Sequence, residues 1–265
     1  MIKKKWLAVG FVLVLSLLIL VGCGQNTKTG GGEAEGEDKQ VWVVGTSADY
    51  EPFEFVDENG DFVGYDIDLI KEIAARLDVE LQIEDMEFNS LIASLQQGRI
   101  DAVIAAISPN PERLEQADFT IPYHQSKQAV LVKSGSDIEV NDFDDLLGYS
   151  IAVQTGTTMD EWATAKIEAG ELAENQLFRY SDANAAAKDV EIGRVDVFLL
   201  DLPPARAHAK VANVDLIYEG KLPDTENSAI AIPKGDTEMA EKLNAIINEL
   251  IEEGFIEQLE DKWLT

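Results

Sequence analysis

Cysteine and histidine are scarce in this chain of 265 residues, which contains one cysteine and two histidines. Because Cys23 is the only cysteine, no intramolecular disulfide bond can form, and this thiol needs another explanation. His124 and His208 have no cysteine or histidine partner at metal-ligand spacing, so the sequence predicts no zinc site. A glycine-rich phosphate loop ending in Gly-Lys-Ser or Gly-Lys-Thr is also absent. Any ATP hydrolysis must therefore come from another protein, and we expect no cofactor.

Basic residues are few as well. The chain has 21 Lys and Arg against 50 Asp and Glu, for a formal net charge of −29 at pH 7. Such a surface repels nucleic acid and anionic lipid, so a nucleic-acid function is excluded. The acidic residues 57–68 resemble a calcium-binding loop, but Phe62 occupies the position where that loop needs glycine. We therefore predict no calcium site and take the acidity as a solubility feature.

The N-terminal residues have the layout of a secretory signal. Three lysines, Lys3 to Lys5, precede an apolar run over residues 6–22 that is too short to predict a membrane span. Leu20 and Gly22 before Cys23 resemble the lipobox of bacterial lipoproteins. The resemblance implies cleavage before Cys23 and acyl chains such as palmitate on that residue, which would hold the protein on the extracytoplasmic face of the cell membrane. A core cysteine after an uncleaved anchor is the alternative.

The residues after Cys23 are rich in glycine and charge and contain no hydrophobic side chain to bury, which is typical of a flexible tether. We assign 1–22 to the signal peptide and 23–39 to the lipidated cysteine and tether. About 225 residues remain, which exceeds a common domain size and makes two lobes as plausible as one.

The rest of the chain alternates between strand and helix patterns. Residues 41–47 (VWVVGTS) favour a strand, and from Ile67 onward apolar residues recur at helical spacing. The alternation begins again after Tyr123, and two amphipathic helices are predicted within residues 236–264. The pattern predicts an α/β fold of two blocks with largely parallel, buried sheets and a helical tail.

Two stretches repeat one another. Leu95 to Pro109 (LQQGRIDAVIAAISP) and Val190 to Pro204 (VEIGRVDVFLLDLPP) share a helix end, Gly-Arg, an aspartate, a buried strand and a proline-containing exit. Coincidence is an open alternative, since glycine at a helix end is common. If the repeat is real, the residues just past the two strands are candidates for a ligand site, because ligands in open α/β sheets bind beyond the carboxyl ends of strands.

The residues beyond these strands carry opposite charges. Ser108 and Arg113 follow the predicted strand of the first repeat, and Asp201 ends the predicted strand of the second. Arginine binds a carboxylate through two parallel hydrogen bonds, and aspartate accepts from an ammonium group, so the pair suits a zwitterion. A surface salt bridge for Arg113 and a helix N-cap for Asp201 are the competing interpretations.

A third candidate element is QTGTT, Gln154 to Thr158, between a predicted strand and a predicted helix. The N–H groups at a helix N-terminus form a natural anion site, to which Thr157 or Thr158 could add a hydroxyl. Plain N-capping by Thr158 is the alternative, and both roles can coexist.

Several motifs, in this order, resemble the family 3 extracellular solute-binding proteins of bacterial polar amino-acid ABC transporters. They are VGTSADYEPFEF, GYDIDLI, FNSLIASLQQGRIDAVIAAISPNPERLEQADFTIPY, VQTGTT and GRVDVFLLD. The resemblance runs from about Val41 to the C-terminus. It implies a periplasmic-binding-protein-like α/β fold of type II, with two lobes joined by two strand crossovers: 40–125 and 226–265 in lobe 1, and 126–225 in lobe 2.

The resemblance also implies a set of ligand-binding residues. They are Ser47, Tyr50, Phe88, Ala106, Ser108, Arg113, Thr157, Thr158 and Asp201. The ligand's α-carboxylate would meet Arg113, Ser108 and the backbone near Thr157 and Thr158. The ammonium group would meet Asp201 and the Ala106 carbonyl. Tyr50 and Phe88 would sandwich the ligand side chain, although core packing is the alternative for both.

Some positions depart from the family pattern. Ser47 stands where several relatives with polar or basic ligands carry an acidic residue, and Ala105 and Ala106 replace serine or glycine. Leu200 replaces a polar residue that some glutamine-binding relatives use. These departures do not single out a ligand. The very acidic surface suits a free L-amino acid with a polar or basic side chain better than one with a second carboxylate.

The resemblance implies a monomeric, non-enzymatic receptor that delivers an amino acid to an ABC permease and its ATPase. One alternative is an enzyme on the same scaffold, such as a cyclohexadienyl dehydratase, with Glu51, Glu87 or His124 as general acid. The other is a tethered ligand-sensing domain.

Overall fold

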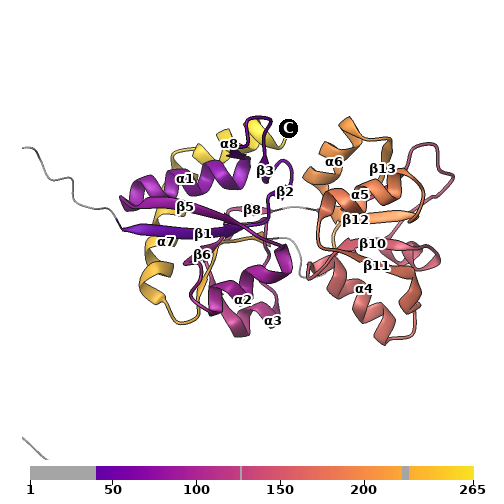
Figure 1. The fold of residues 1–265 in the computed structure, drawn as a ribbon, viewed down its shortest axis with the longest axis horizontal. Helices are drawn as coiled ribbons and strands as arrows, with labels where there is room; N and C mark the ends of the chain where they lie inside the picture. Colours follow the sequence, from indigo (N-terminus) through magenta and orange to yellow (C-terminus); the bar gives the residue numbers. More distant parts are fainter. Residues whose placement is uncertain (1–39, 126, 223–226) are drawn as a thin grey trace, which may run out of the picture. The chain divides into compact units, whose positions relative to one another are not determined.

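The computed structural model describes residues 40–125, 127–222 and 227–265. The predicted signal peptide, Cys23 and the tether lie outside these residues. Within them the chain forms two five-stranded sheets, each with helices on both faces (Figure 1). The first sheet with its helices is called lobe 1, and the second sheet with its helices is called lobe 2.

The sheet of lobe 1 has the strand order β5-β1-β6-β15-β7. Its strands are β1 (Val41–Thr46), β5 (Glu80–Asp85), β6 (Ala102–Val103), β7 (Ala117–Phe119) and β15 (Ala231–Pro233). Strand β1 pairs in parallel with β5 and β6, whereas β15 runs antiparallel to β6 and β7. A small antiparallel sheet adjoins it, formed by β2 (Asp49–Tyr50), β3 (Glu54–Val56) and β4 (Phe62–Val63).

Helices cover both faces of this sheet (Figure 1). One face carries α1 (Tyr65–Leu77), α7 (Thr237–Glu252) and α8 (Phe255–Trp263). The other carries the 3-10 turn η1 (Phe88–Ser90), α2 (Leu91–Gln96) and α3 (Pro111–Gln116).

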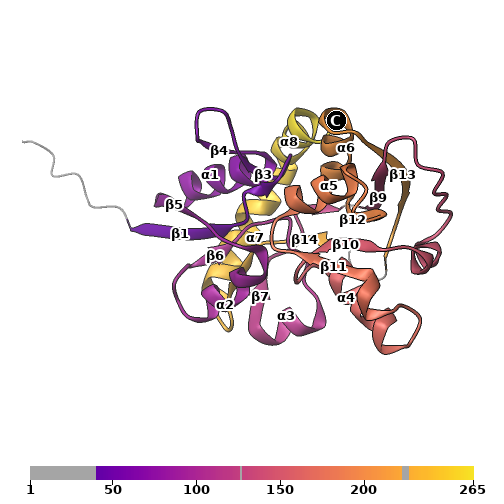
Figure 2. The same cartoon turned by 45° about the vertical axis from the view of Figure 1, so that its right-hand side comes forward.

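The sheet of lobe 2 has the order β11-β10-β12-β9-β13. Its strands are β9 (Gln128–Lys133), β10 (Ile151–Gln154), β11 (Leu177–Tyr180), β12 (Val197–Asp201) and β13 (Val214–Gly220). Figures 1 and 2 show α5 (Ala183–Glu191) and α6 (Leu202–Val211) on one face and α4 (Thr158–Glu168) on the other. Two 3-10 turns, η2 (Phe143–Gly148) and η3 (Glu174–Gln176), complete this lobe.

Strand β12 is buried on both faces, which explains its unbroken run of apolar residues. Phe198 and Leu200 pack into the core beneath α5 and α6, whereas Val197 and Leu199 pack into the core on the α4 side. A strand buried on both faces needs hydrophobic residues at every position. Polarity returns only at Asp201, where the strand ends.

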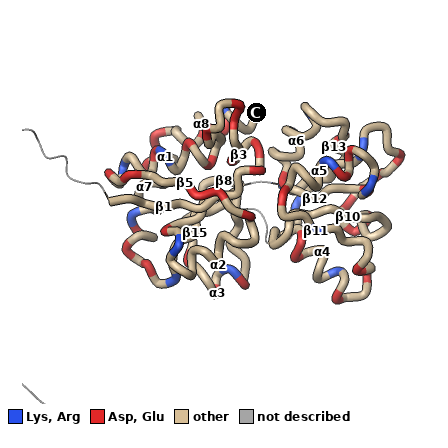
Figure 3. Tube along the Cα trace, viewed as in Figure 1, with Lys and Arg blue, Asp and Glu red and all other residues tan. Residues whose placement is uncertain are grey.

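The chain passes between the lobes twice. It leaves lobe 1 after β8 (His124–Gln125) and returns with β14 (Asn227–Ser228), and these two strands pair antiparallel to one another. The predicted boundaries after residues 125 and 225 remain predictions. In the described part of the chain no helix is long and apolar enough to cross a membrane, and acidic residues are spread over both lobes (Figure 3).

The predicted two-lobed α/β fold is confirmed. The repeated stretches contribute β6 and β12, each third in its sheet. The sheets are largely parallel as predicted, since four of the five strands in each run in the same direction. The exceptions are β9 and β15, which follow the two crossovers and join their sheets antiparallel. Helix α3 was missed because its six residues are too short to show periodicity. Its signal was Asn110 as N-cap followed by Pro111.

Candidate ligand-binding site

A small cavity of about 20 Å³ lies where the carboxyl ends of β1, β6, β10 and β12 approach one another. All nine residues predicted to bind the ligand line it, together with Asp49, Glu54, Ala105, Gln154 and Met159. The residues come from both lobes, so the sequence analysis identified most of the lining. The contribution of each one to binding remains a prediction.

Arg113 forms one end of the cavity. Asn110 caps α3 by accepting a 2.6 Å hydrogen bond from the Arg113 backbone N–H. The guanidinium group donates to the carbonyls of Ser108 and Gly156, both at 2.6 Å, and its carbon lies 5.4 Å from the centre of the Phe88 ring. Burial lowers the pKa of Arg113 from its usual value. Within the described residues no carboxylate forms an ion pair with it, so the salt-bridge alternative is not observed.

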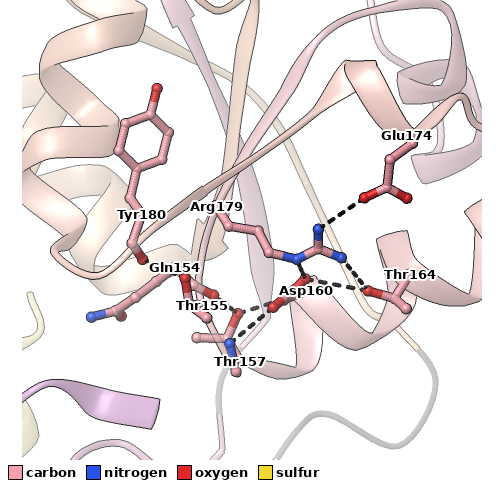
Figure 4. Close-up of polar contacts among 9 residues, drawn as sticks. Gln154, Thr155, Thr157, Asp160, Thr164, Glu174, Arg179 and Tyr180 are labelled. Carbon is pink, nitrogen blue, oxygen red and sulfur yellow. Dashed lines mark hydrogen bonds and ion pairs between the residues drawn. The ribbon is translucent and has the colours of Figure 1, made fainter.

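The N-terminus of α4 borders the same end. Thr157 is the N-cap and accepts from the Asp160 N–H at 3.3 Å, so the cap predicted at Thr158 is one residue off. Asp160 accepts from the Gly156 N–H at 2.9 Å and from Arg179 Nε at 2.7 Å (Figure 4). The first N–H groups of a helix have no partner within it. Since Thr158 is the first residue of α4 and lines the cavity, its N–H is suited to an anion.

Asp201 forms the opposite end. It precedes α6 but makes no side-chain cap, so the N-cap alternative fails. Its carboxylate instead accepts from Tyr50 Oη at 2.9 Å and from Gln128 Nε2 at 3.2 Å. Burial raises the pKa of Asp201 to about 6, although these two hydrogen bonds oppose the shift. Tyr50 belongs to lobe 1, so this contact also bridges the lobes.

Two buried carboxyl groups lie behind Ala106. Ala106 has a left-handed backbone with φ of 45°, and its N–H donates to Asp66 Oδ2 at 2.7 Å. Tyr123 Oη donates to the same oxygen at 2.8 Å. Glu54 and Asp66 are fully buried neighbours.

Burial changes the titration of both carboxyl groups. Within the described residues, neither Glu54 oxygen nor Asp66 Oδ1 has a hydrogen-bond partner. Burial and the neighbouring Asp66 raise the pKa of Glu54 well above its usual value, and burial raises that of Asp66 to about 7. Both shifts favour the uncharged carboxyl group. The sequence analysis missed this pair, because Glu54 and Asp66 meet only when β3 and α1 pack together.

Asp49 was also missed. It is partly buried and accepts from Ser47 Oγ at 3.0 Å, Gln154 Nε2 at 3.0 Å and the Ala183 N–H at 2.6 Å. The last two donors belong to lobe 2. The departure at Ser47 was a usable signal, because an acidic residue follows two positions later.

The residues proposed as general acids for an enzyme are not part of this cavity. Glu51 and Glu87 are exposed, and His124 lies beside Glu260 on α8, with its Nδ1 3.3 Å from that carboxylate. None of the three lines the cavity.

Comparisons with known proteins agree with the geometry. Residues 42–265 match the model of the bacterial extracellular solute-binding proteins, family 3. The arginine-binding extracellular protein ArtP of Bacillus subtilis strain 168 is 32% identical over 268 residues, which cover 99% of this chain and 98% of that protein. The L-cystine-binding protein TcyJ of Escherichia coli K12 is 28% identical over 86% of this chain and 84% of its own.

Solved structures show the same relationship. An ancestral arginine-binding protein bound to arginine superposes with a TM-score of 0.79 and 34% identity, covering 86% of this chain and all of the other. The family match over residues 42–265 extends over both lobes and includes the strands whose ends form the cavity. The chain therefore belongs to the family 3 bacterial extracellular solute-binding proteins, whose relatives here are named as amino-acid-binding proteins.

Proposed function

We propose that the cavity binds one free L-amino acid, held by its α-carboxylate at Arg113 and by its α-ammonium group at Asp201. The observation that carries this proposal is the placement of these two opposite charges, from different lobes, along one small cavity. The alternative partners considered for both residues, a surface salt bridge and a helix cap, are not used within the described residues.

The polar groups fit the two ends of a zwitterion. A buried charge is costly unless it is paired. Arg113 retains N–H groups beyond the two that hold the Ser108 and Gly156 carbonyls, and the Thr158 N–H can add a further donor to a carboxylate. At the other end, Asp201 and the Ala106 carbonyl supply acceptors for an ammonium group.

The ligand side chain is polar or cationic rather than acidic in this proposal. The cavity lining contains three carboxyl groups, those of Asp49, Glu54 and Asp201, and one guanidinium group. A second ligand carboxylate would add an unpaired negative charge there. The relatives named for arginine binding point in the same direction.

Binding is expected to favour contact between the lobes. Tyr50 with Asp201, Asp49 with Gln154, and Arg113 with Gly156 already form hydrogen bonds between them. A ligand that adds contacts on both sides stabilises the closed arrangement over an open one.

The cellular role that we propose is capture for an ABC importer. The processed protein would be a monomer held by lipid on Cys23 at the extracytoplasmic face of the cell membrane, and it would present the amino acid to a permease and its ATPase. Incorporation of labelled palmitate into the wild-type chain but not into Cys23→Ser tests the anchor. A soluble wild-type protein without lipid would contradict it.

A thermal-shift screen against the twenty amino acids tests the binding function. Residues 39–265 form one compact unit and are used after unfolding and refolding to remove carried-over ligand. A ligand at about 100 times its Kd adds roughly 2.7 kcal/mol to the free energy of unfolding, or on the order of 5 to 10 °C in Tm. A flat screen with native protein would overturn the proposal.

Experiments can distinguish the importer role from two others, those of an enzyme and of a sensor. An enzyme would turn over prephenate or arogenate, and its general acid would have to be Glu54, the buried carboxyl group of the lining whose pKa is raised by burial and by Asp66. A sensor would bind the amino acid equally well but would not restore uptake when supplied to a transport-deficient host. Binding without turnover, together with restored uptake, supports the importer role.

A further inference from the structure

We propose that Asn110 is a positioning residue for ligand binding: its side chain orients Arg113 within lobe 1 and, through a hydrogen bond to Glu161, holds lobe 2 closed over that end of the cavity. This inference rests on the proposed function and adds to it two residues, Asn110 and Glu161, that do not line the ligand cavity. The two ends of one side-chain amide carry the two roles.

The Asn110 side chain uses its oxygen and its nitrogen in different lobes. Its Oδ1 accepts from the Arg113 backbone N–H at 2.6 Å and so caps α3. Its Nδ2 donates to Glu161 Oε1, in the first turn of α4 in lobe 2. Only 5% of Asn110 is exposed, and buried polar groups need hydrogen-bond partners. The amide therefore joins the residue that carries the guanidinium group to the helix whose N-terminus borders the same end of the cavity.

The backbone on either side of Asn110 is fixed by two prolines, Pro109 and Pro111. A residue before proline is restricted to extended backbone, and Asn110 has φ of −133° and ψ of 169°. Pro111 begins α3, where its own fixed φ suits a helix. Because this backbone has little freedom to lose when the lobes meet, the contact with Glu161 forms at a low entropic cost.

The contact lies beside a groove between the lobes. The groove, of about 430 Å³, runs between α2 and α3 of lobe 1 and α4 of lobe 2, and Arg113, Gly156 and Glu161 line it. Arg113 Nη2 donates to the Gly156 carbonyl at 2.6 Å, which is a second bond between the lobes. Changing Arg113 would also remove the proposed partner of the ligand carboxylate. The bond between Asn110 and Glu161 can be changed without altering a residue of the ligand cavity.

A bond that forms only between closed lobes raises the ratio of closed to open protein. The ligand affinity rises with this ratio, because the closed form makes the ligand contacts from both lobes. In the open form, water replaces each partner of the bond. The effect is therefore that of an ordinary net hydrogen bond, roughly threefold to tenfold. Asn110 would thus tune the affinity without contacting the amino acid.

Three variants separate the bond between the lobes from the helix cap. Asn110→Ser and Asn110→Asp both keep a side-chain oxygen that can cap α3. Serine is one atom shorter and lacks the amide donor, whereas aspartate places a second negative charge opposite Glu161. Asn110→Asp combined with Glu161→Gln exchanges the amide and the carboxylate, so the bond can form again in the reverse direction.

The ratio of closed to open protein is measured first, without any ligand. Residues 39–265 contain no cysteine, so Gln97→Cys and Ala169→Cys, at the exposed ends of α2 and α4, place one spin label on each lobe. Electron–electron resonance then gives the distribution of distances between the labels. We expect the ratio to fall roughly threefold to tenfold in Asn110→Ser and further in Asn110→Asp, and to return to within about threefold of wild type in the exchanged pair.

Ligand release gives the second readout. The probe is L-arginine, replaced by the amino acid with the largest thermal shift if arginine gives none. Because release requires the lobes to open, stopped-flow kinetics should show release from Asn110→Ser that is roughly threefold to tenfold faster, with association within about twofold of wild type. Glu168→Gln is the control, since it removes an exposed charge on α4 that lines the same groove. It should change the closed ratio by less than about twofold.

The outcomes separate the two proposals. An unchanged closed ratio and release rate in Asn110→Ser, or no recovery in the exchanged pair, would overturn the role of Asn110 while leaving amino-acid binding intact. Binding of none of the twenty amino acids by the wild-type protein would overturn the proposed function itself. An unchanged circular dichroism spectrum shows that each variant is folded.

Discussion

The two ends of the cavity are built differently. At the Arg113 end, one buried cation is surrounded by neutral groups, namely the Ser108 and Gly156 carbonyls and the Phe88 ring. At the Asp201 end, the carboxyl groups of Asp49, Glu54, Asp66 and Asp201 gather, and within the described residues none of them forms an ion pair with a cation of the protein. The Arg113 end therefore offers a positive charge to an anionic ligand group, whereas the acidic end depends on protons or on ligand cations for its charge balance.

The largest expected effect comes from removing the single cation. Arg113→Ala leaves a ligand carboxylate buried without a partner, which costs about 3 to 5 kcal/mol, or roughly 200- to 5,000-fold in Kd. Calorimetry measures the loss. Arg113→Lys is the matched control and should recover part of the affinity, because it restores charge without the two-pronged geometry. Wild-type affinity in the alanine variant would refute the role of Arg113.

Asp201 should make binding depend on pH. Its pKa of about 6 means that the carboxylate is protonated as the pH falls below that value, and an uncharged carboxyl group pairs poorly with an ammonium group. We expect the affinity to fall by up to about tenfold for each pH unit below 6. In Asp201→Asn binding is weak throughout and this dependence disappears. A wild-type affinity that is constant from pH 7 to pH 5 would contradict the assignment.

The Glu54 proton should appear in the stability of the ligand-free protein. A raised folded-state pKa stabilises the fold below the unfolded-state value, and this contribution is lost as the pH rises toward the folded-state pKa. Relative to Glu54→Gln, which stays neutral, the wild-type protein should lose up to about 1.4 kcal/mol of unfolding free energy per pH unit above roughly 4.5. Urea unfolding at several pH values checks this. Parallel curves for the two proteins would show that the pKa of Glu54 is not raised in the folded protein.

The smallest effect is expected from the support of the α4 N-terminus. Arg179→Gln removes the 2.7 Å contact that orients Asp160, which in turn holds the Gly156 N–H. Because Arg179 is partly exposed, we expect only a twofold to fivefold loss of affinity, on the scale of about 0.5 to 1 kcal/mol for such a pair. Glu174→Gln, which removes the exposed 3.5 Å contact to the same arginine, is the control and should change nothing measurable. Equal losses of ligand affinity in both variants would show that the contact of Arg179 with Asp160 does not support ligand binding.

The cationic end could be predicted from sequence better than the acidic end. Arg113 stands alone between strand patterns, and the repeated stretches pointed to Asp201, so both ends of the zwitterion site had a local signal. Glu54 and Asp66 gave none, because they meet only when β3 and α1 pack together. Asp49 lay next to a recognised departure at Ser47, but its contact with Ala183 crosses between lobes and 134 positions of sequence.

The fold was likewise predicted where the signal is local in the sequence and missed where it depends on tertiary arrangement. Alternating strand and helix patterns were enough for the two α/β lobes, since a doubly buried strand such as β12 must be apolar throughout. The direction of individual strands could not be predicted in this way, because whether β9 and β15 run antiparallel depends on where the chain enters after each crossover.

The most direct test of zwitterion recognition compares an amino acid with its own fragments. The amino acid that gives the largest thermal shift is titrated by calorimetry beside its decarboxylated amine and its α-hydroxy acid, which lack the α-carboxylate and the α-ammonium group in turn. We predict that each fragment binds at least about 100-fold more weakly, because each leaves Arg113 or Asp201 buried without its partner. A fragment that binds as tightly as the amino acid would contradict the assignment of that end of the cavity.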